Sequence, residues 1–197
     1  QHFMPEHAAE FTEQFGHLAD ERGLFRMAIT CYLLRSGGKN ILVDSGLGNR
    51  RRPNFPVGHL DESIANAGLT PADIDIVLNT HLHIDHTGWN TVLRNGRWVP
   101  TFPKAKYIFH KGEYAFWEEM TKKGANPPGN VWTYNCRPIV EAGQALLVDA
   151  QAAQPLGART LEVIQVGAVV DDAAGVGVLV VHPHGKAEQR GRGRELP

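Results

Sequence analysis

The sequence predicts one α/β domain in which strands and helices alternate along the chain. Two patterns indicate this fold class: apolar residues recur at every second position over residues 26–34, and at helical spacing over residues 111–123. With 197 residues, the chain is long enough to bury a sizeable core. Strands that alternate with helices and include an adjacent hairpin are typical of an α/β sandwich, rather than of an all-α or all-β fold.

Glycine turns and apolar alternation predict the first elements. Residues 1–25 are mixed in composition, and we expect a helical or irregular lead-in there. Residues 26–34 are apolar on both faces, which predicts a strand that is covered on both sides. Gly37 and Gly38 then predict a hairpin turn, because glycine adopts the positive φ that such turns need, and residues 40–44 predict the returning strand.

Cap and breaker residues place the later elements. Asp61 predicts the N-cap of a short helix that runs to Ala67 and ends at Gly68. Pro71 fits the first position of a capped helical turn, because its missing N–H costs nothing there. The remaining expected elements are a central strand at residues 73–80, a strand at 105–110, a helix at 111–123 with Gly124 beyond its end, and strands at 139–149 and 159–164.

Composition argues against several classes of partner. The formal net charge of -1 gives no attraction to nucleic acid, and no apolar run approaches the roughly 20 residues that span a bilayer. We therefore expect a small-molecule substrate and neither a nucleic-acid nor a membrane partner. Cys31 and Cys136 are too few for a disulfide framework. The chain opens with Gln1 and without a charged-then-apolar leader, which indicates that N-terminal residues, and any export signal with them, have been lost. The expected location is cytoplasmic.

Four side chains of metal-binding types occur within six residues, directly after the expected central strand: His81, His83, Asp85 and His86. Imidazole nitrogens and carboxylate oxygens are ligands that suit Zn²⁺ and related metals. His81 and His83 are two positions apart, so an extended chain can project both to the same side. Gly88 allows the turn that follows to be sharp. The spacing therefore predicts a metal site at the end of a strand.

The pattern His81-x-His83-x-Asp85-His86 resembles the HxHxDH signature of the metallo-β-lactamase superfamily. Upstream, Val43-Asp44-Ser45-Gly46 resembles the family's aspartate segment, and residues 102–107 resemble the strand after the signature. The resemblance covers about residues 26–164 and is similar in detail to N-acyl-homoserine lactonases and organophosphate-hydrolase-like members, in which Gly-Trp-Asn follows the signature. It implies the N-terminal half to two-thirds of the family's αββα sandwich.

The resemblance also implies roles for these residues. His81 and His83 would bind a first metal ion, and Asp85 and His86 a second. Zinc is expected, with manganese, iron or cobalt as alternatives. Asp44 would orient the ligands through hydrogen bonds, unless it only caps a turn. The implied reaction is hydrolysis of a lactone, an ester or a similar small molecule by metal-activated water, with Asp85 as the catalytic residue that holds the nucleophile and passes on its proton.

Toward the C-terminus the resemblance is incomplete. The family supplies a third histidine for the first metal after the position of residue 164, but residues 165–172 contain none. We therefore expect a partial domain at residues 1–164 and a divergent, poorly ordered tail at residues 165–197. The alternative function is a truncated, inactive remnant, whose partly exposed apolar sheet face would favour a homodimer. Substitute ligands could come from Asp171, Asp172, His182 or His184.

Overall fold

The structure is a computed structural model that describes residues 7–21, 28–51, 57–124, 130–149, 162–169, 177–181 and 187–189. Its strands are β1 (Ala28–Ser36), β2 (Lys39–Val43), β3 (Ile76–Leu78), β4 (Thr91–Arg94), β5 (Arg97–Pro100), β6 (Lys106–His110), β7 (Ala145–Val148), β8 (Glu162–Val169), β9 (Gly177–Val181) and β10 (Ala187–Gln189). Its α-helices are α1 (Ala8–Phe15), α2 (Leu60–Asn66), α3 (Ile84–Thr87), α4 (Lys111–Lys122) and α5 (Arg137–Glu141). Shorter helical segments are the 3₁₀ turns η2 (Gly16–Leu18), η3 (Pro71–Asp73) and η4 (Gly88–Asn90), and the π-helical η6 (Trp132–Cys136).

Eight of the described strands form one mixed sheet in the order β10-β9-β8-β1-β2-β3-β6-β7. Strands β2, β3, β6 and β7 run parallel to one another, whereas β1 pairs antiparallel with both β2 and β8. The register places Val43 of β2 beside Leu78 of β3, and Leu78 beside Ile108 of β6. The loops that follow these parallel strands therefore meet at one edge of the sheet, which is where ligands bind in open α/β sheets.

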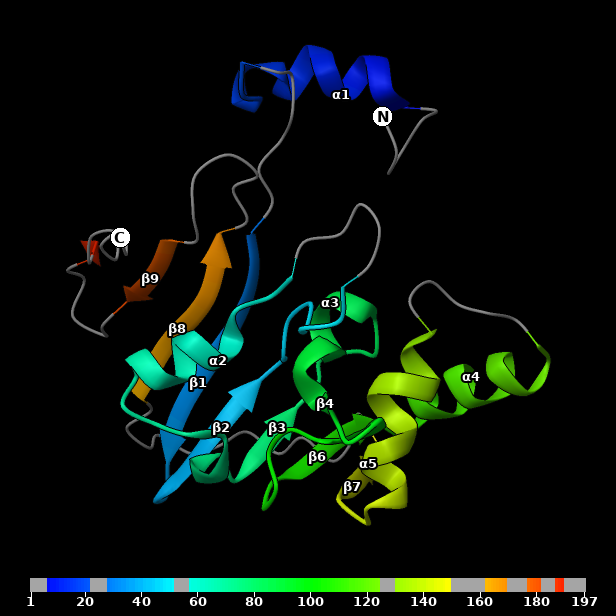
Figure 1. Cartoon of the computed structure of the whole chain (residues 1–197). Coiled ribbons are helices and arrows are strands. Elements are labelled where there is room, and N and C mark those ends of the chain that lie inside the picture. Colours follow the sequence, from blue (N-terminus) through cyan, green and yellow to red (C-terminus); the bar gives the residue numbers. More distant parts are fainter. Residues whose placement is uncertain are drawn as a thin grey trace.

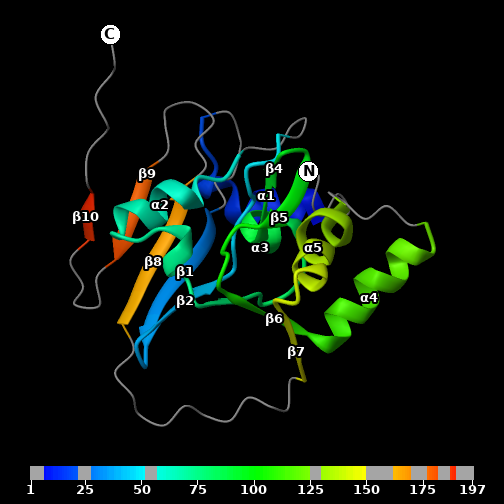
Figure 2. The same ribbon diagram turned by 60° about the horizontal axis from the view of Figure 1, so that its bottom comes forward.

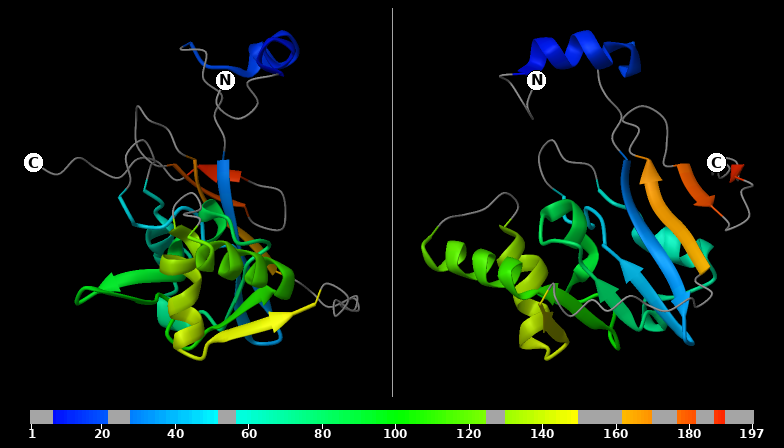
Figure 3. Two further views of the ribbon diagram at one scale, coloured as in Figure 1. Left: turned by 90° about the vertical axis from the view of Figure 1, so that its right-hand side faces the viewer. Right: turned by 180° about the vertical axis from the view of Figure 1, so that it is seen from behind.

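Helices α2, α3, α4 and α5 lie on one side of the sheet (Figure 1), and β1 and β8 lie in front of α2 in the view from behind (Figure 3). Figure 2 shows α2 beside β8, and α4 and α5 beside β6 and β7. Between the two layers, Leu42, Val77 and Phe109 of the strands form one buried cluster with Ile64 of α2 and Ile139 of α5. Burial of each such side chain contributes about 1.5–3 kcal/mol to folding.

The predicted hairpin near the N-terminus is confirmed, and α1 forms part of the expected lead-in. Gly37 and Gly38 form the turn of the β1–β2 hairpin, with φ angles of 56° and 72°. Strand β1 buries Cys31 and Leu33, but Tyr32 on the opposite face is 42% exposed. The prediction that this strand is covered on both sides is therefore wrong at Tyr32.

Three predicted boundaries are also wrong. Helix α2 begins at Leu60 with His59 at the N-cap, and Asp61 lies in the first turn, where its charge still favours the helix N-terminus. The central strand is limited to β3, because the chain forms η3 before it and turns toward α3 after it. The predicted strand at residues 139–149 is instead the end of α5, a turn at Gly143 with a φ of 68°, and β7.

The β4–β5 hairpin has no counterpart among the predicted elements. Its turn residues Asn95 and Gly96 both have positive φ, 49° and 76°, as two-residue hairpin turns require. Strand β8 continues across residue 164, and β9 and β10 lie within the expected tail, so the position of the domain boundary stays a prediction. Within the described ranges, no helix has the length and apolar character needed to cross a membrane.

Candidate functional site

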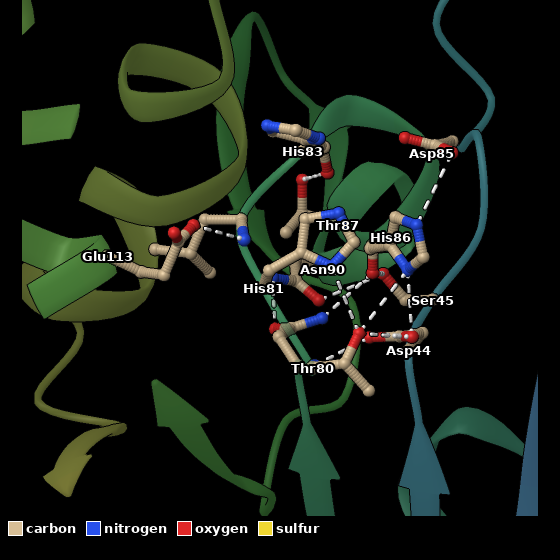
Figure 4. Close-up of polar contacts among 12 residues, drawn as sticks. Asp44, Ser45, Thr80, His81, His83, Asp85, His86, Thr87, Asn90 and Glu113 are labelled. Atoms are coloured by element: carbon tan, nitrogen blue, oxygen red, sulfur yellow. Dashed lines mark hydrogen bonds and ion pairs between the residues drawn. The ribbon is translucent and has the colours of Figure 1, made fainter. Parts of the chain in front are cut away.

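The residues predicted to bind metal lie where the parallel strands end. Strand β3 leads into the loop that carries His81 and His83, and α3 carries Asp85 and His86 (Figure 4). The neighbouring strand β2 leads into Asp44, whose backbone N–H donates to the carbonyl of the last residue of β3 at 2.8 Å. The parallel pairing of two strands therefore brings all five predicted site residues to one edge of the sheet.

Asp44 is buried and accepts three hydrogen bonds through its side chain. One carboxylate oxygen accepts the backbone N–H of Thr80, and the other lies 2.8 Å from both the Thr80 hydroxyl and the Nδ1 atom of His86. Asp44 also has a φ of 58°, a left-handed conformation that is uncommon for residues other than glycine. These contacts suit the predicted orienting role of Asp44, because they fix both the loop after β3 and the ring of His86.

The imidazole of His86 joins two carboxylates. Its Nδ1 contacts Asp44, and its Nε2 lies 3.3 Å from Oδ2 of Asp85. The hydrogen bonds to Asp44 and then to Asp85 raise the pKa of His86 to about 9, and the bond to His86 in turn lowers the pKa of Asp85. His86 therefore holds a proton on each nitrogen at neutral pH, and Nε2 would have to lose its proton before binding a metal.

The ring of His81 lies between those of His86 and His83 and contacts both. The ring centroid of His81 is 3.9 Å from that of His86 and 4.5 Å from that of His83. Burial lowers the pKa of His81, and the charges of His86 and His83 lower it further. Neutral imidazole is the form that binds metals, so this environment favours the ligand state of His81.

The side chains at this edge fit a divalent metal in donor type. Imidazole nitrogen and carboxylate oxygen are zinc ligands, and a histidine whose Nδ1 is held by a carboxylate, as in His86, is typical of metal sites. In the part of the chain that the structure describes, however, no group of three or more His, Cys, Asp or Glu side chains is placed to hold one ion. The candidate substitute ligands Asp171, Asp172, His182 and His184 lie outside the described residues.

Backbone hydrogen bonds join the segment after β2 to the segment after β3. The N–H of Ser45 donates to the carbonyl of His86 at 2.7 Å, the N–H of Gly88 donates to Gly46 at 2.6 Å, and the N–H of Trp89 donates back to Ser45 at 3.1 Å. Gly88 itself has a φ of -60°, which any residue can adopt. Its predicted role in a sharp turn is therefore wrong, and Gly88 instead allows the two backbones to approach closely.

Residues 24–189 match the sequence profile of the Metallo-beta-lactamase superfamily. The chain belongs to this superfamily. The resemblance predicted from the HxHxDH pattern is thus confirmed, and the matched segment extends beyond residue 164, where we expected the resemblance to end.

Solved structures support the same fold. A probable metal-dependent hydrolase from Staphylococcus aureus superposes with a TM-score of 0.58 at 22% identity, over 81% of this chain and 55% of that chain. The hydrolase AbOPH in the beta lactamase superfamily superposes with a TM-score of 0.56 at 21% identity, over 83% of this chain and 58% of that chain. The alignments with these two structures thus span little more than half of their length.

A network of buried hydrogen bonds holds the backbone of the signature segment in place. The side chain of Asn79 donates to the carbonyl of His86 at 2.8 Å and accepts a hydrogen bond from Asn90 at 2.9 Å. The side-chain oxygen of Asn90 in turn accepts a hydrogen bond from the Ser45 hydroxyl at 2.9 Å. Asn79, Asn90 and Ser45 are at most 4% exposed, so water cannot satisfy these groups and the hydrogen bonds do so instead. The network thereby fixes the carbonyl of His86.

A second chain of hydrogen bonds reaches the signature from η6. Asn135 donates to the hydroxyl of Thr87 at 3.0 Å, and that hydroxyl donates to the carbonyl of His83 at 2.9 Å. Asn135 lies in a π-helical turn, a conformation that occurs frequently at functional sites. The sequence assigned no role to Asn135, because a single asparagine far along the chain carries no spacing pattern.

Proposed function

We propose that this chain is a metal-dependent hydrolase that acts on a lactone, an ester or a similar small molecule. One observation carries the proposal: His86 lies between Asp44 and Asp85, and the ring of His81 lies against the rings of both His86 and His83, at the sheet edge where a ligand would bind. The descriptions of the two superposed proteins, a probable metal-dependent hydrolase and a hydrolase, agree with this class of reaction.

His81 and His83 would hold one cation, and Asp85 and His86 a second, with zinc as the expected ion and manganese, iron or cobalt as alternatives. A bound cation supplies a water of lowered pKa and polarises the substrate carbonyl. His86 would bind through Nε2, because Asp44 already holds its Nδ1.

Asp85 is the residue of this chain that would handle the proton of the attacking water. The Asp85 side chain is 38% exposed, so the attacking water can reach it. The hydrogen bond from His86 lowers the pKa of Asp85, so the carboxylate is ionised at neutral pH and can accept a proton. Asp85 would then pass that proton to the leaving group, as a general base that becomes a general acid.

The alternative is a catalytically inactive remnant that binds metal weakly or not at all. The observation that favours it is the absence, among the described residues, of three or more ligand-type side chains placed around one point. A zinc ion held by two protein ligands leaves its other positions to water, and its binding is correspondingly weak.

Metal content decides between the two. The full chain would be dialysed against metal-free buffer after zinc loading, and bound zinc measured by elemental analysis in wild type and in the His81→Ala/His83→Ala double variant. A matched control replaces two exposed histidines elsewhere, His7 and His17. Zinc retained by the wild type and the control but lost from the double variant, together with turnover in a lactone and ester screen, supports the hydrolase. Equal, negligible zinc in all three proteins refutes it.

A further inference from the structure

The carboxylate of Glu113, in the first turn of α4, contacts the loop that carries the first two signature histidines. Its Oε2 atom accepts the backbone N–H of Leu82 at 3.0 Å and the indole N–H of Trp117 at 3.2 Å. Figure 4 shows Glu113 reaching this loop from the neighbouring helix. A single oxygen therefore ties α4 to the peptide that lies between His81 and His83.

Leu82 is held from two sides. Its side chain is fully buried in the core, and its N–H is bound by Glu113. The residues on either side of it, His81 and His83, are the two that would share one cation. Because the backbone at Leu82 is fixed, the directions of both neighbouring side chains are restricted before any metal arrives.

Trp117, which donates a hydrogen bond to Glu113, also contacts the ring of His83. The indole ring is buried and meets the imidazole of His83 edge-on, with ring centroids 5.7 Å apart and an interplanar angle of 78°. Glu113 holds the indole N–H and so limits the rotation of this ring. His83 is exposed, so this aromatic contact is a packing constraint on a side chain that otherwise faces solvent.

We propose that Glu113 is a positioning residue that preorganises His81 and His83 for metal binding, through its hydrogen bonds to Leu82 and Trp117. This inference rests on the proposed function, because it assigns the two histidines to a cation. The rival explanation is that an acidic residue in the first turn of α4 only stabilises the helix through its charge.

Two variants separate these explanations. Glu113→Gln removes the charge but keeps one amide oxygen, which can accept both hydrogen bonds as Oε2 does now. Glu113→Ala removes the charge and both bonds. The control is Glu119→Ala, which removes an exposed carboxylate of the same helix that forms an ion pair with Lys123.

Zinc affinity, measured by competition with a chromophoric chelator, is the first readout. Loss of a residue that orients metal ligands typically weakens metal binding about 10–100-fold, which is the change we expect for Glu113→Ala. Glu113→Gln should stay within about 3-fold of wild type because the acceptor remains, and Glu119→Ala should be unchanged. Equal losses in the alanine and glutamine variants would show that the charge matters and would overturn the proposal.

The exchange rate of the Leu82 amide hydrogen in the metal-free protein is the second readout, followed by NMR. We expect Glu113→Ala to speed this exchange about 10-fold or more, because a protected amide opens more easily once its acceptor is gone, while amides of the β1–β2 hairpin keep their rates. An unchanged Leu82 rate overturns the proposal. If wild type binds no zinc, the proposed hydrolase function fails, and the Leu82 rates alone decide whether Glu113 fixes this loop.

Discussion

Gly88 lies directly against the peptide that joins Leu47 to Gly48. A Cβ atom at Gly88 would overlap the carbonyl group of Leu47 and the amide nitrogen of Gly48, and a Cβ at Gly48 would overlap the carbonyl group of Gly88. This contact joins the segment after β2, which begins with Asp44, to the segment that carries the signature histidines. The glycine after the signature is therefore required by the close approach of two backbones.

We expect Gly88→Ala to lower the free energy of unfolding by about 1–3 kcal/mol or more, because the added methyl group meets rigid backbone instead of a movable side chain. Urea denaturation followed by circular dichroism measures this loss. Gly16→Ala is the matched control, since a Cβ there makes only an ordinary 3.6 Å contact with Thr12 and the φ is negative. Similar stabilities for the two variants would contradict the overlap.

Replacing Asn90 tests the network of buried hydrogen bonds. Asn90→Ala leaves the side-chain oxygen of Asn79 without its donor and removes an acceptor from Ser45, in an interior that excludes water. Because an unsatisfied buried group costs 1–3 kcal/mol, we expect a loss of about 2–3 kcal/mol in the free energy of unfolding. Asn66→Ala, at an exposed position of α2, should change stability by less than about 0.5 kcal/mol. A small effect at Asn90 would show that water replaces the network.

The sequence predicted the fold class and placed the site at the end of β3 because those features depend on local patterns. Apolar alternation marked β1 and β2, and the tight spacing of His81, His83, Asp85 and His86 marked the loop. The β4–β5 hairpin was not predicted, although Asn-Gly, the sequence of its turn at Asn95 and Gly96, is typical of two-residue hairpin turns.

Other features depend on tertiary contacts that no local pattern encodes. Glu113 reads from the sequence as one more charged helical residue, and only the packing of α4 on the loop shows that it binds Leu82. Asn79 and Asn90 adjoin the signature, yet their polarity alone predicts exposure, whereas both are buried. The predicted strand at residues 139–149 overlaps the end of α5, because Ile139 and Val140 form too short an apolar stretch for its period to distinguish a helix from a strand.

Both cysteine thiols should be unreactive in the native protein. Cys31 and Cys136 are buried, and burial raises the pKa of Cys31 to about 12 and also raises the pKa of Cys136. Because the thiolate is the reactive form, a chromogenic disulfide reagent at pH 8 should label neither thiol in native buffer and both in denaturant. Rapid labelling of the native protein would show that β1 or η6 opens readily. The Cys31→Ala and Cys136→Ala variants identify which thiol reacts.

The ion pairs of His86 predict how the stability of the metal-free protein depends on pH. The contacts with Asp44 and Asp85 raise the pKa of His86 from 6.5 to about 9 in the folded state. A group whose pKa is raised by folding stabilises the protein fully below its unfolded pKa, and this contribution is lost as the pH rises through the folded value. The stabilisation by protonated His86 should therefore be complete below about pH 6.5 and absent above about pH 9.

Comparison with His86→Gln, in the presence of a chelator, isolates this contribution from other titrating groups. The difference in the free energy of unfolding between wild type and variant should be larger at pH 6 than at pH 9.5, and a difference that does not change with pH would contradict the assignment. Asp44→Asn offers an independent test, because asparagine tolerates the positive φ of this position but removes the charge. NMR titration of the His86 ring in that variant should give a pKa below the wild-type value, since hydrogen bonding to Asp44 is the largest cause of the increase.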